Sequence, residues 1–120
     1  MTDALPTRLG DLMVSQSMVG DIRVIALSGE LDHTVRDHMT KVLSPPTDAE
    51  PSRTVADFTR VTFMDSSGVN ALIAAHRAVQ DAQGWLRIAG PQPQVLRVIQ
   101  LVGIDTVIAC YPTLRQALAS

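Results

Sequence analysis

Apolar residues recur along this chain with two different periods, one typical of β-strands and the other of α-helices. Strand character is found over residues 12–19, 22–28, 54–58, 85–89 and 106–111. Helical spacing of apolar residues is found over residues 33–43, 66–83, 93–102 and 112–119. Asp32 directly precedes the first of these segments and is a candidate helix N-cap. Strands that alternate with helices are typical of right-handed crossovers in a mostly parallel sheet. The sequence therefore predicts an α/β fold.

The first two predicted strands are separated only by Gly20 and Asp21, a sequence that favours a tight β-hairpin turn. The hairpin adds an antiparallel part, which predicts a mixed sheet of about five strands with about four helices. Residues 44–53 contain three prolines and cannot continue a helix, so we expect a surface loop there. We expect residues 1–10 to be a flexible N-terminus and residues 1–120 to form a single domain.

Composition narrows the class of protein. With 120 residues, of which 46% are hydrophobic, the chain can bury one core without disulfides or metals. Its 10 basic and 12 acidic residues give a net charge of −2, which argues against nucleic acid as a partner. No apolar run fits a signal peptide or a membrane span. Cys110 is the only cysteine, so no intrachain disulfide can form and we expect a cytoplasmic location.

The most informative segment joins a strand to the longest predicted helix. Residues 61–64 have strand character, and Asp65, Ser66, Ser67 and Gly68 then lead into helical spacing. A serine in this place lies at a helix N-terminus, where unpaired N–H groups and the helix dipole favour anions. Ser66 is therefore a candidate phosphate acceptor. The simpler alternative is that these polar residues only cap the helix.

Catalytic chemistry fits these residues poorly. A nucleophilic serine on a strand-to-helix turn requires a small residue two positions before it, and Met64 and Asp65 stand there instead. His76 lies almost three helical turns from Ser66, too far for a hydrogen bond. Asp57 and Asp65 resemble part of a magnesium or phosphoaspartate site, but no further acidic cluster and no later lysine accompanies them. The sequence thus predicts no catalytic residue, no metal and no cofactor.

Two separated blocks, LSGELD at residues 27–32 and VTFMDSSGV at residues 61–69, resemble the anti-sigma factor antagonist family. That family is built on the STAS domain, which is shared with sulfate transporters. The resemblance extends over nearly the whole chain, because the hairpin, Gly84, residues 90–91 and the turn at 101–104 fall where the STAS domain has them. It implies a single STAS-type domain.

The resemblance also implies a function. In that family the dephosphorylated protein binds an anti-sigma factor that is an ATP-dependent serine kinase, and the sigma factor is released. Phosphorylation of the serine after the motif's aspartate ends this binding, and a metal-dependent serine phosphatase restores it. That serine is Ser66 in this chain. The partner-binding residues that the resemblance implies are Asp32, Asp65, Ser66, Ser67, Gly68 and Asn70.

Departures from the family pattern affect the expected specificity. Asn70 stands where the family usually has glycine, so a larger polar side chain on the first turn of the helix is expected to affect partner choice. Residues 56–60 match the family's strand end loosely. Two alternatives remain at this point: a STAS scaffold or transport-accessory subunit whose Ser66 is never phosphorylated, and a small nucleotide-binding or hydrolytic protein that uses Ser66 and Asp32.

Overall fold

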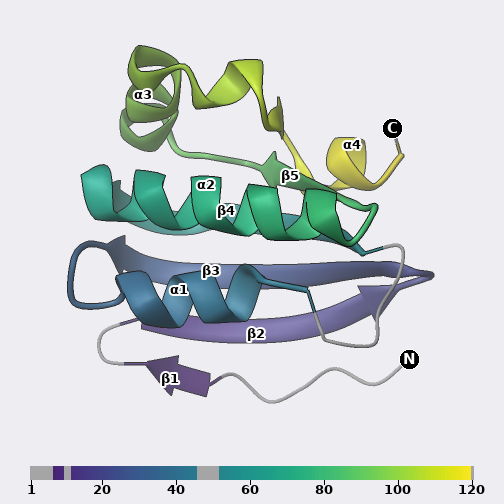
Figure 1. Cartoon of the computed structure of the whole chain (residues 1–120). Coiled ribbons are helices and arrows are strands. Elements are labelled where there is room, and N and C mark those ends of the chain that lie inside the picture. Colours follow the sequence, from purple (N-terminus) through teal and green to yellow (C-terminus); the bar gives the residue numbers. More distant parts are fainter. Residues whose placement is uncertain (1–6, 10–11, 46–51, 120) are drawn as a thin grey trace.

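The computed structural model describes residues 7–9, 12–45 and 52–119, which form a six-stranded mixed sheet with helices (Figure 1). The strands follow one another in sequence order: β1 Thr7–Leu9, β2 Leu12–Val19, β3 Ile22–Leu31, β4 Arg53–Met64, β5 Trp85–Ala89 and β6 Ala109–Tyr111. The helices are α1 Arg36–Leu43, α2 Ser66–Asp81, α3 Pro93–Val102, the 3₁₀ helix η1 Ile104–Thr106 and α4 Leu114–Ala119. The first three strands are antiparallel and the others parallel. The predicted α/β class and hairpin are confirmed.

Several elements have different bounds from those expected. The edge strand β1 was not predicted, because three residues are too few to show a period. The strand expected over 106–111 is wrong in its first half, since η1 and a turn precede β6. The last helix begins two residues later than expected, at Leu114, because the Thr113 hydroxyl accepts a hydrogen bond from the Gln116 N–H and caps it.

Parts of two sequence predictions lie outside the described residues. Of the expected flexible N-terminus, residues 1–6 and 10 are not described, while residues 7–9 form β1. Of the expected surface loop at 44–53, residues 46–51 are not described, and its last two residues depart from the expectation, because Ser52 is buried and Arg53 begins β4. None of the helices in the described part of the chain is long and apolar enough to cross a membrane.

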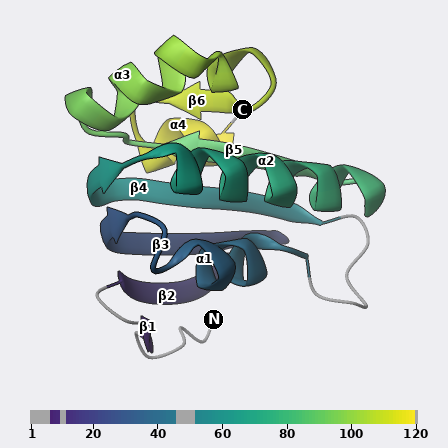
Figure 2. The same ribbon diagram turned by 60° about the vertical axis from the view of Figure 1, so that its left-hand side comes forward.

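The two faces of the sheet carry different helices. Helices α1 and α2 lie side by side over one face (Figures 1 and 2) and cover a core to which Leu27 and Phe58 contribute. Side chains alternate between the faces of a strand, so Val55 and Ala89, which neighbour core residues, point to the opposite face. There they pack against Ala117 of α4. Helix α4 therefore covers only the part of the second face nearest β4–β6.

The parallel pairing of β3 and β4 determines where the candidate site lies. Leu31 pairs with Met64 at the carboxyl ends of these two strands. Both strands are followed by helices that begin at the same edge of the sheet, α1 after β3 and α2 after β4 (Figure 1). Ligands and partners of α/β proteins are typically bound at this edge.

Candidate functional site at the carboxyl edge of the sheet

Helix α2 begins directly after β4 because Asp65 caps it. The Asp65 backbone is extended, and its carboxylate accepts a hydrogen bond of 2.8 Å from the Ser67 N–H. Its carbonyl accepts the first helical hydrogen bond, from Val69 N–H at 3.1 Å. Ser66 is therefore the first helical residue, and its side chain is exposed. The prediction of a serine at a helix N-terminus is confirmed.

Gly68 allows the first turn of α2 to lie against the ends of the two strands. A Cβ atom at this position would lie 2.5 Å from Met64 Cγ and 3.1 Å from both the Leu31 Cβ and the Leu31 carbonyl oxygen. The Asp65 N–H also donates to the Leu31 carbonyl at 3.3 Å, which ties the junction to β3. Close backbone contact, rather than an unusual backbone conformation, thus requires glycine here and holds Ser66 in place.

Asp32 has a different role from the helix cap that the sequence predicts. Its Oδ1 accepts hydrogen bonds from the Thr34 N–H at 2.9 Å and the Thr34 hydroxyl at 2.6 Å. Helix α1 begins only at Arg36, after Val35, which provides no side-chain cap. The prediction that Asp32 caps a helix starting at residue 33 is wrong, because the threonine hydroxyl and N–H bind the carboxylate in a local turn.

The same hydrogen bonds keep the Asp32 carboxylate charged. The Thr34 hydroxyl, followed by the Thr34 N–H, lowers the pKa of Asp32 below its ordinary value, because both donors stabilise the ionised form. The pairing of Leu31 with Met64 places Asp32 and Asp65 at equivalent positions, each directly after its strand. Two carboxylates therefore lie at the edge from which α2 presents Ser66.

The other predicted site residues lie on α2. Asn70 is four residues after Ser66, so these two exposed side chains share one face of the helix. Ser67 is half-buried and contributes its backbone N–H to the Asp65 cap. Gly68 is buried and contributes packing rather than a surface. No group of three or more histidine, cysteine, aspartate or glutamate side chains suited to a metal occurs in the described part of the chain.

Sequence reasoning missed two residues at this edge. Thr34 holds Asp32, and the spacing of an aspartate two residues before a threonine was the available signal, since it is typical of a local side-chain turn. Phe63 is an exposed aromatic residue just before the junction, with 46% of its surface accessible. Its neighbour Met64 is buried, so alternation along the strand was the signal for Phe63.

The crossover helices on a mixed sheet, with a serine at the first turn of α2, define a small α/β domain whose candidate site is a surface. Comparison with family models gives the particular family. The model of the STAS domain matches residues 16–117, and the chain belongs to this family.

Three relatives show how far the similarity extends. The anti-sigma F factor antagonist of Paenibacillus polymyxa is 24% identical over 91 residues, covering 75% of this chain and 78% of that protein. The structure of an anti-sigma factor antagonist from Mycobacterium paratuberculosis superposes with a TM-score of 0.75 at 26% identity, covering 93% and 96% of the two chains. The anti-sigma factor antagonist SpoIIAA in its unphosphorylated form gives a TM-score of 0.64 at 26% identity, covering 88% and 92%.

Proposed function

We propose that this protein is a cytoplasmic anti-sigma factor antagonist, a binding switch without catalysis of its own. Its dephosphorylated form binds an anti-sigma factor, an ATP-dependent serine kinase, and thereby releases a sigma factor. Phosphorylation of Ser66 ends the binding, and a metal-dependent serine phosphatase resets the switch. The names of the relatives and the family of the chain support the role of antagonist.

The observation that carries the proposal is the exposed Ser66 hydroxyl at the first position of α2. A kinase can reach this hydroxyl without unfolding the domain. The side chains of Asp32 and Asp65 already bring two carboxylates to the same edge, and a phosphate adds about −1.5 to −2 charges at neutral pH. The modification thus adds charge to a surface whose backbone packs closely against the strands at Gly68.

Local repulsion is sufficient for a switch of this kind. The Ser67 N–H is already bound to Asp65, so a phosphate on Ser66 competes with that carboxylate for the helix N-terminus. A partner surface packed tightly on the dephosphorylated edge would meet both the added volume and the added charge. A loss of about 1.4 to 2.8 kcal/mol corresponds to a roughly ten- to hundredfold weaker complex.

The first experiment is intact-mass analysis after incubation with ATP and each candidate anti-sigma kinase from the same genome. We expect the addition of one phosphate, located on Ser66 by peptide fragmentation. Ser67→Ala is the matched control. It removes the hydroxyl next to Ser66 but keeps the Ser67 backbone N–H that binds Asp65, so phosphorylation of Ser66 should be retained. Absence of phosphate with every kinase would favour a STAS scaffold that is never phosphorylated.

Binding to the kinase that modifies Ser66 tests whether charge at this position weakens the complex. We expect Ser66→Ala to bind whether or not ATP is present, whereas Ser66→Asp binds at least about tenfold more weakly because of its charge. Ser66 is exposed, so both variants should fold normally. Equal affinity of the two variants would contradict the switch. Calorimetry with ATP and GTP alone should show no heat of binding, since the proposal includes no nucleotide site.

A further inference from the structure

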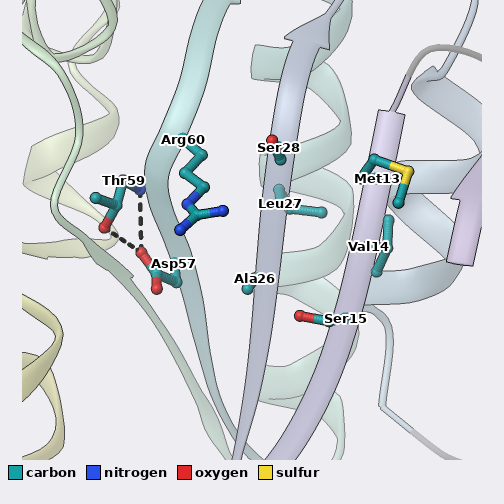
Figure 3. Close-up of a pocket in the computed structure, with 9 residues that line it drawn as sticks. All are labelled: Met13, Val14, Ser15, Ala26, Leu27, Ser28, Asp57, Thr59 and Arg60. Carbon is teal, nitrogen blue, oxygen red and sulfur yellow. Dashed lines mark hydrogen bonds between the residues drawn. The ribbon is translucent and has the colours of Figure 1, made fainter. Parts of the chain in front are cut away.

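A hollow lies on the face of the sheet opposite α1 and α2 (Figure 3). It has a volume of about 520 Å³ and is lined by residues of β2, β3 and β4. Leu27 is part of the core beneath the helices, so its neighbours Ala26 and Ser28 point to the opposite face and form the floor of the hollow. Its volume is that of a site for a small organic molecule.

A β-bulge in β4 brings two charged side chains to this hollow. The register pairs Ala26 with Asp57 and Ser28 with Arg60, so that one residue of β3 faces two residues of β4. In a regular strand, residues three positions apart point to opposite faces. The additional residue of the bulge brings Asp57 and Arg60 to the same face, beside Ala26 and Ser28 of β3.

Hydrogen bonds hold the bulge in this form. The Asp57 carboxylate accepts hydrogen bonds from both the N–H and the hydroxyl of Thr59 (Figure 3). The Thr59 carbonyl in turn accepts a hydrogen bond of 3.0 Å from the Gln92 side chain. Asp57 is thus engaged within the bulge, while the Arg60 side chain extends over the hollow.

The polar groups around the hollow are mainly unused donors. Met13, Ser28 and Arg60 lie in one row across three strands, and Ser15 pairs with Ala26 in the next row. No hydrogen bond or ion pair joins the Arg60 guanidinium or the hydroxyls of Ser15 and Ser28 to the residues that the structure describes. These groups offer one positive charge and two hydroxyls to a ligand, beside the Asp57 carboxylate, which also lines the hollow and whose Oδ1 is bound by Thr59.

We propose that this hollow binds a small organic carboxylate with a short alkyl chain. The carboxylate is held between the Arg60 guanidinium and the Ser28 hydroxyl, which are neighbours in the ladder. The alkyl chain lies over Ala26 and against Met13, a partly exposed side chain that adapts to irregular ligands. The site is separate from the α2 edge and does not depend on the role of Ser66.

Hexanoate is the probe, titrated into the unphosphorylated full chain and followed by the amide resonances in ¹H–¹⁵N NMR spectra. We expect saturable shifts centred on Ala26, Ser28 and Arg60. Hexanol and hexylamine, which lack the negative charge, should bind at least about tenfold more weakly, because they lose the charge-assisted hydrogen bonds. Shifts that do not saturate, or equal binding of hexylamine, would overturn the proposal.

Variants separate a specific site from general attraction of anions. Arg60→Gln should raise the Kd for hexanoate about tenfold or more. Arg97→Gln is the matched control, because it removes the same charge from an exposed position on α3. Ser28→Val should also weaken binding, since it fills the floor of the hollow with a residue that strands tolerate. Equal effects of the two arginine variants, or unchanged binding by Ser28→Val in a folded protein, would refute the site.

Discussion

The β3–α1 and β4–α2 junctions begin alike and end differently. Each strand ends in a buried apolar residue, Leu31 or Met64, that is followed by an aspartate. Asp65 caps α2 at once, whereas Asp32 binds Thr34 in a turn and α1 begins four residues after it. An aspartate after a strand therefore presents a helix N-terminus only where the next residues can enter the helix directly.

The third residue after each aspartate explains the difference. Gly68 allows α2 to touch Leu31 and Met64, and any side chain there would overlap with them. At the equivalent position after Asp32 stands Val35, which is only 2% exposed and fills the core instead. A glycine thus brings one helix close to the sheet, while a valine occupies the corresponding space at the other junction. Ser66 is therefore exposed at a junction that packs closely against the two strands.

Of the substitutions at the two junctions, Gly68→Ala should change the free energy of unfolding most. Alanine favours the helix by about 1 kcal/mol, but overpacking against Leu31 and Met64 costs about 1 to 3 kcal/mol. Because the Leu31 carbonyl belongs to a central strand and cannot move away easily, we expect the overpacking to dominate. With a cost in the upper part of that range, urea unfolding should show a net loss of about 1 to 2 kcal/mol.

Asn70→Ala is the control for that substitution. Its side chain is exposed on the same part of α2, so stability should change by less than about 0.5 kcal/mol. A Gly68→Ala variant as stable as the wild type would mean that the helix does not need its close approach to the strands.

The next largest effect should be a difference in stability between alanine variants of the two aspartates. Asp65→Ala removes the cap of α2 and should cost about 1 kcal/mol in thermal or urea unfolding. Asp65→Asn keeps an oxygen acceptor for the Ser67 N–H and should restore most of this loss. Asp32→Ala should destabilise the domain less than Asp65→Ala, because Asp32 stabilises only an exposed turn. A loss from Asp32→Ala that equals or exceeds that from Asp65→Ala would contradict the distinction.

Hydrophobic periodicity predicts the regular parts of the fold well. Helix α2 was expected over residues 66–83 and spans Ser66–Asp81, and the hairpin strands and β5 were also found. These elements have one buried face over two or more turns or several residues, so their periods are unambiguous. The exposed Ser66 followed from the same pattern, because a polar segment interrupts two apolar ones.

Local side-chain chemistry was harder to predict. Periodicity cannot distinguish an aspartate that caps a helix from one that binds Thr34, because both precede apolar residues at helical spacing. Strand character was expected over 54–58 and again over 61–64, whereas β4 extends without interruption over Arg53–Met64, because the bulge interrupts the alternation between the two segments. For the same reason the hollow near Arg60 could not be seen from the sequence.

The smallest predicted effect concerns the charge of Asp32. Thr34→Val keeps the shape of the threonine and its N–H donor but removes the hydroxyl, which contributes most to lowering the pKa of Asp32. We expect this pKa to rise toward its ordinary value in a ¹³C NMR titration of the carboxyl group from about pH 2 to about pH 6. Thr40→Val is the control, because the Thr40 hydroxyl donates to the Arg36 carbonyl and not to Asp32.

The sign of the pH dependence follows from the direction of this shift. Because the pKa of Asp32 is lower in the folded chain than in the unfolded chain, its stabilising contribution is complete above the ordinary pKa. It is lost as the pH falls through the folded pKa. Thr34→Val should reduce this acid-sensitive contribution and leave the Asp65 cap of α2 unchanged. An unchanged pKa of Asp32 in this variant would show that the backbone N–H alone holds the carboxylate, and the two junctions would then differ only in packing.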